Sequence, residues 1–298
     1  MKLHLSKHFF MRNALVLAAI VFTSKLAFGQ NPATYSWFGH SGKTTGWSKV
    51  VAACADADVI LFGEQHDDAI AHWFQLLLLE ELQRRDSTNV ALGMEMLERD
   101  QQWAIDLFAA GTITGEKLED TTKMWSNFHT DYLPAVRFAV QHHLPVVATN
   151  IPRRYASMVF KKGVASLDTL SPSVKSWMTP LPFPVDTSLS QYRELVKMGM
   201  EMHASGLNFA TAQAIKDATM AHFILSAWKP GMHFLHLNGA YHSDFHQSIE
   251  WYLKQRNPAL KVVTISTISQ SQLKKLDSEN REKADFVLVT PENMIRTM

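Results

Sequence analysis

The sequence contains a single cysteine, Cys54, among its 298 residues. One cysteine excludes an intramolecular disulfide, so the protein must depend on its hydrophobic core for stability. We also expect no lipid anchor, because that modification needs a cysteine directly after a signal cleavage point and Cys54 lies too far along the chain. Cys54 falls in a stretch with helical spacing, 47–55, where we expect its thiol to be buried.

The sequence also has almost no net charge. Its 29 Lys and Arg residues are balanced by 28 Asp and Glu residues, which leaves a formal charge of +1. The basic residues do not gather in a block. A nucleic-acid partner is therefore not expected, because binding a phosphate backbone requires a basic patch.

Long apolar runs are absent as well. The apolar run near the start of the chain, Ala14–Phe22, is shorter than the roughly 20 residues that a membrane-spanning helix needs. Basic residues precede this run, namely Lys2, Lys7 and Arg12. The small residues of Ala27-Phe28-Gly29 follow it, and the whole pattern is typical of a cleaved signal peptide. We therefore expect a signal peptide over 1–29 and a mature chain over 30–298 that is secreted across the inner membrane into the periplasm and has no membrane span.

Six short apolar segments, rich in β-branched residues, are typical of buried strands. They are 58–63, 89–93, 144–149, 232–237, 261–266 and 286–289. Segments that are apolar on both faces and alternate with helical patterns favour a parallel sheet covered on both sides. We therefore predict one α/β domain with a mostly parallel sheet flanked by helices. Residues 151–230 show no strand pattern but include a long helical pattern over 207–228, so we expect a helical insertion that acts as a lid over one end of the sheet.

Polar residues follow four of the predicted strands. Ligands in open parallel sheets bind at the carboxyl ends of the strands, so these residues are candidates for a site. They are Glu64 and His66 after the first strand, Glu95 after the second, Arg153 and Arg154 after the third, and Tyr241 and His242 after the fourth. We predict that one cleft is lined by Glu64, His66, Glu95, Arg153 and His242.

Each candidate also has a purely structural interpretation. Glu64 could accept hydrogen bonds from a helix N-terminus, and the two arginines could be solvated surface charges. Glu95 lies between two methionines, so we expect it to be partly buried and to need a partner, a proton or a metal ion. The spacing Gly63-x-x-His66 recurs as Gly239-x-x-His242, which indicates two tight turns that aim the imidazoles over the sheet edge.

Five short motifs occur in order along the chain. They are Gly63-Glu64-Gln65-His66-Asp67, Gly93-Met94-Glu95-Met96, Asn150-Ile151-Pro152-Arg153, Gln213-x-x-x-Asp217-x-x-Met220-Ala221 and Gly239-x-x-His242. With this order and spacing, the stretch from about Asp58 to Thr290 resembles the ChaN-like haem-binding uptake family, within the Tiki, TraB and erythromycin-esterase-like superfamily. The resemblance implies an α/β sheet with a helical insertion.

The resemblance also implies a haem-binding protein for iron acquisition. Ferric haem needs an apolar cleft, cations for its propionates and an axial tyrosine or histidine. Arg153 or Arg154 could meet a propionate, and the helical insertion could supply the cleft. Tyr155 or Tyr241 could ligate the iron, and the sequence does not choose between them.

A hydrolase is the alternative function. A divalent metal ion held by His66, Glu95 and His242 could activate water, with Glu64 as general base. Without a metal ion, His66 would activate water and Arg153 would stabilise the oxyanion. The substrate would be a peptide or an ester. The sequence leaves the oligomeric state open, including a homodimer.

Overall fold

The computed structural model describes residues 33–86, 89–203 and 205–297. The predicted signal peptide, 1–29, lies outside the described residues. From Tyr35 onward the chain folds as one unit. Within the described ranges, no helix combines the length and the apolar character that crossing a membrane requires.

The described residues form an eight-stranded sheet in the order β2-β1-β8-β7-β3-β6-β4-β5. The strands are β1 (Ser36–Gly39), β2 (Thr44–Thr45), β3 (Val59–Glu64), β4 (Val90–Glu98), β5 (Val146–Asn150), β6 (His233–Gly239), β7 (Val262–Gln270) and β8 (Phe286–Pro291). All six predicted strands are present, and they pair in parallel. Only the short β1 and β2, which the sequence analysis missed, pair antiparallel at one edge. The prediction of a mostly parallel α/β sheet is confirmed.

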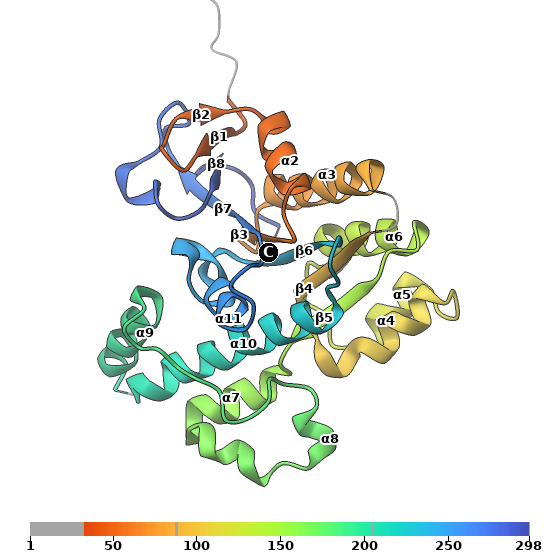
Figure 1. Ribbon diagram of the computed structural model, residues 1–298, viewed down its shortest axis with the longest axis vertical. Helices are drawn as coiled ribbons and strands as arrows, with labels where there is room; N and C mark the ends of the chain where they lie inside the picture. Colours follow the sequence, from red (N-terminus) through yellow and green to blue (C-terminus); the bar gives the residue numbers. More distant parts are fainter. Residues whose placement is uncertain (1–32, 87–88, 204, 298) are drawn as a thin grey trace, which may run out of the picture. The chain divides into compact units, whose positions relative to one another are not determined.

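Helices cover both faces of this sheet (Figure 1). They are α2 (Trp47–Ala55), α3 (Ala69–Arg85), α4 (Gln102–Ala109), α5 (Gly115–Thr121), α6 (Leu133–Gln141), α7 (Arg153–Lys162), α8 (Pro172–Lys175), α9 (Ser190–Glu201), α10 (Gly206–Ala227) and α11 (Ile249–Arg256). Successive side chains of a strand point to opposite faces, so Phe62 packs with α2 and α3, whereas Leu61 packs with α10 and α11. Cys54 is buried in the first of these two cores, as predicted.

The segment 151–230 is helical, as predicted, but its long helix is not simply a lid. Ala214 and Ala218 of α10 belong to the same apolar cluster as Leu61 and Ala91, and α10 lies against β5, so α10 forms part of the layer that covers one sheet face. Helix α9 adds Tyr192 and Leu195 to the same cluster. Helices α7 and α8 pack in a second apolar cluster with Ile151 and the other side of α10. The small alanines allow α10 to approach the sheet closely, which joins the insertion to the main core.

Two stretches of irregular backbone border the candidate site, and the first changes a predicted strand boundary. Strand β4 continues to Glu98 with an irregular register beyond Met94, so Glu95 lies inside the strand instead of after it. After β6, Phe245 and His246 adopt left-handed backbone angles (φ 62° and 56°), and α11 begins only at Ile249. Apolar periodicity signals neither feature, since both arise from irregular backbone.

Gly63 provides a test of how tightly the strand ends pack. A Cβ atom at this position would lie 2.8 Å from Ala240 Cα and 2.9 Å from the Ile265 carbonyl oxygen, and neither backbone can move freely. We predict that Gly63→Ala lowers the free energy of unfolding, measured by urea denaturation, by about 1–3 kcal/mol. Gly39→Ala is the matched control, because its Cβ would meet nothing within 4 Å. Equal stabilities of the two variants would contradict this account.

Candidate functional site at the carboxyl edge of the sheet

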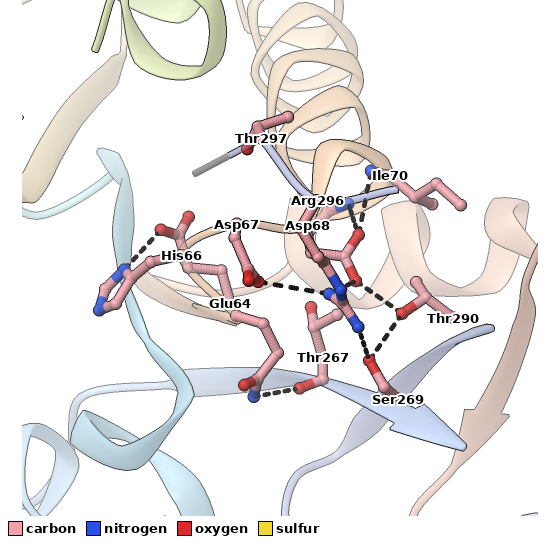
Figure 2. Close-up of polar contacts among 12 residues, drawn as sticks. Glu64, His66, Asp67, Asp68, Ile70, Thr267, Ser269, Thr290, Arg296 and Thr297 are labelled. Carbon is pink, nitrogen blue, oxygen red and sulfur yellow. Dashed lines mark hydrogen bonds and ion pairs between the residues drawn. The ribbon is translucent and has the colours of Figure 1, made fainter. Parts of the chain in front are cut away.

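A buried carboxylate, Glu64, ends strand β3 and orients His66. Glu64 is 2% exposed, and its Oε1 atom lies 2.9 Å from His66 Nδ1 (Figure 2). The Tyr132 hydroxyl donates to the same oxygen at 2.6 Å, while the Gln75 amide donates to Oε2 at 2.5 Å. His72 Nε2 lies 3.4 Å from Oε2. The carboxylate is therefore surrounded by donors, as a buried charge requires.

The charges of this group stabilise one another. Burial opposes ionisation of Glu64, but its hydrogen bonds and charge interactions with His66 and His72 outweigh burial and lower its pKa to about 2. Burial likewise opposes protonation of His66, yet the Glu64 carboxylate raises the pKa of His66 above its usual value. Hydrogen bonding by Nδ1 to Glu64 fixes the orientation of the ring and leaves Nε2 directed elsewhere.

A second buried group joins Glu95 to His242. His242 Nε2 lies 3.0 Å from Glu95 Oε1, and His242 Nδ1 makes a short contact with Asp217 of α10. The Tyr192 hydroxyl donates to the other Asp217 oxygen at 2.7 Å. Burial opposes protonation of His242, but Glu95 and Asp217 outweigh it and raise its pKa to about 9. His242 in turn holds the pKa of Glu95 well below its usual range, against the effect of burial.

Gly239, the last residue of β6, brings the two groups together. Its N–H donates to Glu95 Oε2 at 2.7 Å. A Cβ atom at this position would lie 2.8 Å from His66 Nε2 and 3.5 Å from Glu95 Oε2, so only glycine lets the imidazole approach this closely. The structure therefore brings together four of the predicted residues, namely Glu64, His66, Glu95 and His242.

Arg153 lies outside this buried group and faces an open cavity. The cavity has a volume of about 700 Å³ and is lined by Glu98, Lys123, Met124, Trp125, Ser126, Arg153, Arg154 and Ser157. Its Trp125 ring packs edge-on against His66, with ring centroids 4.7 Å apart, so the cavity adjoins the buried group. A smaller cavity of about 200 Å³ shares Arg153 and also contacts Gln213 and Lys216.

The remaining three candidates lie in different surroundings. Arg154 forms an ion pair with Asp100 at 2.7 Å and stacks 4.6 Å from the Tyr155 ring centre. Tyr241 donates its hydroxyl to the Gln191 carbonyl at 2.6 Å, on the face of the sheet covered by α9 and α10. Arg154 therefore lines the cavity and Tyr155 stacks behind it, whereas Tyr241 is engaged in packing.

The geometry does not support the predicted metal ligands His66, Glu95 and His242. Among the described ranges, no cluster of three or more His, Cys, Asp or Glu side chains could hold a metal ion. Both ring nitrogens of His242 face carboxylates, Glu95 on one side and Asp217 on the other. A protonated imidazole has no lone pair for a metal, which explains the disagreement.

Several residues that hydrogen-bond within the site were not predicted as site residues from the sequence. They are Gln75, Asn127, Asp131, Tyr132 and Tyr192. Tyr132 and Asp131 come from a π-helical turn, Phe128–Tyr132, which apolar periodicity does not reveal. Asp217 was quoted in a motif, and its spacing of four from Gln213 could have placed both on the side of α10 that contacts His242.

Comparison with solved structures finds proteins that are similar to this fold. ChaN of Campylobacter jejuni, in a structure described as cofacial haem binding, matches with a TM-score of 0.65 at 18% identity, over 88% of this chain and 98% of that chain. A Bacillus cereus protein matches with a TM-score of 0.51 at 9% identity, over 87% of this chain and 95% of that chain. The erythromycin esterase EreC gives a TM-score of 0.46 at 13% identity, over 88% and 84% of the two chains. At these identities the likeness to the first two structures establishes the fold alone.

The sequence itself identifies the family. Residues 50–253 match the family described as haem-binding uptake, Tiki superfamily, ChaN. The match covers more than half of the 298 residues, and the chain belongs to this family. The resemblance predicted from the five motifs is confirmed. No curated protein sequence matches the chain.

The Glu95–His242 pair predicts how stability depends on pH. The folded pKa of His242, about 9, lies above its ordinary value of 6.5, so the charged ring contributes stability that is fully present below pH 6.5 and is lost as pH rises through about 9. Glu95→Gln removes one of the two carboxylates that raise this pKa. We predict that the free energy of unfolding, measured in urea at pH 6.5, 8 and 9.5, falls less steeply with pH in this variant than in the wild type.

Glu119→Gln is the control for this measurement. Glu119 also contacts a histidine, His129, at 2.8 Å, but the His129 side chain is 56% exposed. Exposed pairs contribute little to stability, so this variant should follow the wild-type pH profile. If Glu95→Gln has the same pH profile as Glu119→Gln, the Glu95–His242 pair does not stabilise the fold in the way described.

Proposed function

We propose that the protein binds haem in the 700 Å³ cavity beside His66. The observation that carries this proposal is the lining of the cavity. Lys123, Arg153 and Arg154 provide cations for the two propionates, while Met124 and Trp125 provide apolar surface for the porphyrin. The volume lies in the range of about 300–1,000 Å³ that is usual for small-molecule sites. Family membership and the fold shared with ChaN of Campylobacter jejuni support the same ligand.

Tyr155 is the axial ligand that we propose for the iron. It lies next to Arg154, which lines the cavity. The centre of its ring lies 6.5 Å from the centre of the Trp177 ring. Tyr241 is less suitable, because its hydroxyl already donates to a backbone carbonyl. Burial also raises the pKa of Tyr241 to about 12, which disfavours the phenolate that ferric iron prefers.

The proposed haem site can be tested by titrating the purified protein with hemin and following the Soret band. We expect a saturable shift in the wild type. Tyr155→Phe should weaken the affinity for hemin by about tenfold or more, as expected when a metal ligand or its support is lost. Tyr241→Phe, the matched control, should bind as well as the wild type. The stoichiometry at saturation tells whether haem binds singly or cofacially, as described for the relative.

Two outcomes would contradict parts of this proposal. Absence of a Soret shift at micromolar wild-type protein would rule out haem binding in the cavity. A loss of affinity in Tyr241→Phe but not in Tyr155→Phe would assign the iron to the other tyrosine.

Arg153→Ala should weaken binding of hemin without changing the Soret maximum, because it removes a propionate contact and not an iron ligand.

We further propose that the protein is exported, which the basic, apolar and small residues of 1–29 support. We also propose that it serves iron acquisition, which membership of the haem-binding uptake family supports. Intact-mass measurement on protein from the envelope fraction is expected to give a chain that lacks residues 1–29 and carries no acyl group. A mass that includes Met1–Gly29 would contradict export with cleavage. The proposal also allows a homodimer. Sedimentation velocity with and without hemin measures the oligomeric state.

Hydrolysis is a second candidate function, and the Glu64–His66 pair favours it. Glu64 holds His66 through Nδ1, and among the described residues no side chain hydrogen-bonds to Nε2. Such a ring could accept a proton from water, and Arg153 in the adjoining cavity could stabilise an oxyanion. Hydrolysis of an activated ester that disappears in His66→Gln would support this function. Ester hydrolysis that is unchanged in His66→Gln would exclude it.

A further inference from the structure

The last part of the chain returns to the loop that carries His66. After β8, residues 292–297 form no regular helix or strand, and Ile295 is 89% exposed. Beyond a turn in which Met294 N donates to the Pro291 carbonyl, the hydrogen bonds of this segment come from its final residues, Arg296 and Thr297. Figure 2 shows both beside the loop that follows β3.

Arg296 contacts the two residues that follow His66 in this loop, Asp67 and Asp68. Its Nη1 atom lies 3.3 Å from Asp67 Oδ1 and 3.3 Å from Asp68 Oδ2, and its Nη2 atom donates to Ser269 Oγ at 2.5 Å (Figure 2). Asp68 is fully buried, and its other oxygen caps α3 by accepting from the backbone N–H groups of residues 70 and 71. Arg296 therefore compensates a buried charge that sets where α3 begins.

Thr297 hydrogen-bonds to the same loop. Its backbone N–H donates to the Asp67 carbonyl at 3.1 Å, and its hydroxyl donates to Asp131 Oδ2 at 2.6 Å. The Asn127 amide donates to that same Asp131 oxygen at 2.7 Å and to the His66 carbonyl at 2.8 Å. Thr297 is thus connected to the His66 backbone through Asp131 and Asn127.

Asp131 also connects Thr297 to the His66 side chain. Asp131 Oδ2 lies 3.3 Å from His72 Nδ1, and His72 Nε2 lies 3.4 Å from Glu64 Oε2. Glu64 in turn accepts from His66 Nδ1 at 2.9 Å. Because buried polar groups polarise one another, a donor lost at Asp131 changes the hydrogen bond that orients the His66 ring.

We propose that Arg296 and Thr297 are positioning residues for His66, and that the segment 292–297 is a clasp that fixes the loop 65–68 and the orientation of the imidazole. Among the described residues, the clasp makes no hydrogen bonds other than these and the one within its own turn, so its release mainly breaks these bonds. Arg296 and Thr297 do not line the 700 Å³ cavity, and they position His66 in the ligand-free protein. This positioning of His66 does not depend on whether the site binds haem or hydrolyses a substrate.

The test uses ¹⁵N-labelled protein and measures the ring-nitrogen chemical shifts of His66 at one fixed pH, assigned with His66→Gln. Thr297→Val removes only the hydroxyl donor, whereas Thr297→Ser keeps it. We expect Thr297→Val to displace both His66 ring-nitrogen shifts, and Thr297→Ser to restore the wild-type values. Ile295→Ala is the control within the clasp and should leave the shifts unchanged, because Ile295 is almost fully exposed.

Amide hydrogen exchange of residues 65–70 provides a second measurement. We expect exchange at least about threefold faster in Arg296→Gln and Thr297→Val, because loosening the clasp raises the population of locally open states. Circular dichroism verifies that the variants remain folded. If Thr297→Val keeps the wild-type shifts and exchange, or if Ile295→Ala changes them equally, the clasp does not position His66. Failure of the wild type to bind hemin would contradict the proposed function but not these results.

Discussion

Burial of ionised carboxylates at the end of a parallel sheet is the constraint on which the site depends. Glu64 and Glu95 are 2% and 5% exposed, and a buried charge without partners would be strongly destabilising. Each therefore faces an imidazole and at least one neutral donor. Glu64 has its partners on α3, the π-helical turn and the loop after β3. Glu95 has its partners, Gly239 and His242, at the end of β6. Helix α3 and the π-helical turn pack on one face of the sheet and must dock before Glu64 is satisfied. His242, the partner of Glu95, is held by Asp217 of α10 on the other face, so folding and site assembly depend on each other.

The same constraint explains the irregular backbone around the site. A π-helical turn at Phe128–Tyr132 lets Asp131 face His72 while the adjacent Tyr132 reaches Glu64. Regular helical geometry separates adjacent side chains by about 100°, which would turn one of them away. At β6, glycine at position 239 removes the side chain that would push His66 and Glu95 apart. Irregular geometry occurs here because several polar groups converge on a small volume.

The sequence contained most of the fold and about half of the site. Apolar strands such as β3 and β6 are visible because they are buried on both faces, and their carboxyl ends correctly located Glu64, His66 and His242. Glu95 was located correctly although β4 extends past it. Partners such as Tyr132 and Asp131 could not be found, because their contacts with residues far away in sequence depend on the docking of a π-helical turn. The metal prediction was not supported because spacing cannot show that Asp217 takes the second nitrogen of His242.

The site consists of two parts with different physical character. The open cavity holds Arg153 and Arg154 at exposed positions, where charges are screened and ligands can enter. The buried part holds Glu64, Glu95 and His242 away from solvent, where each charge strongly affects the next. His66 lies between them, half-exposed beside Trp125 and hydrogen-bonded to Glu64. An anionic ligand in the cavity would favour the protonated ring, while the buried carboxylates keep that ring oriented. His66 is therefore the residue through which ligand charge and the buried network act on each other.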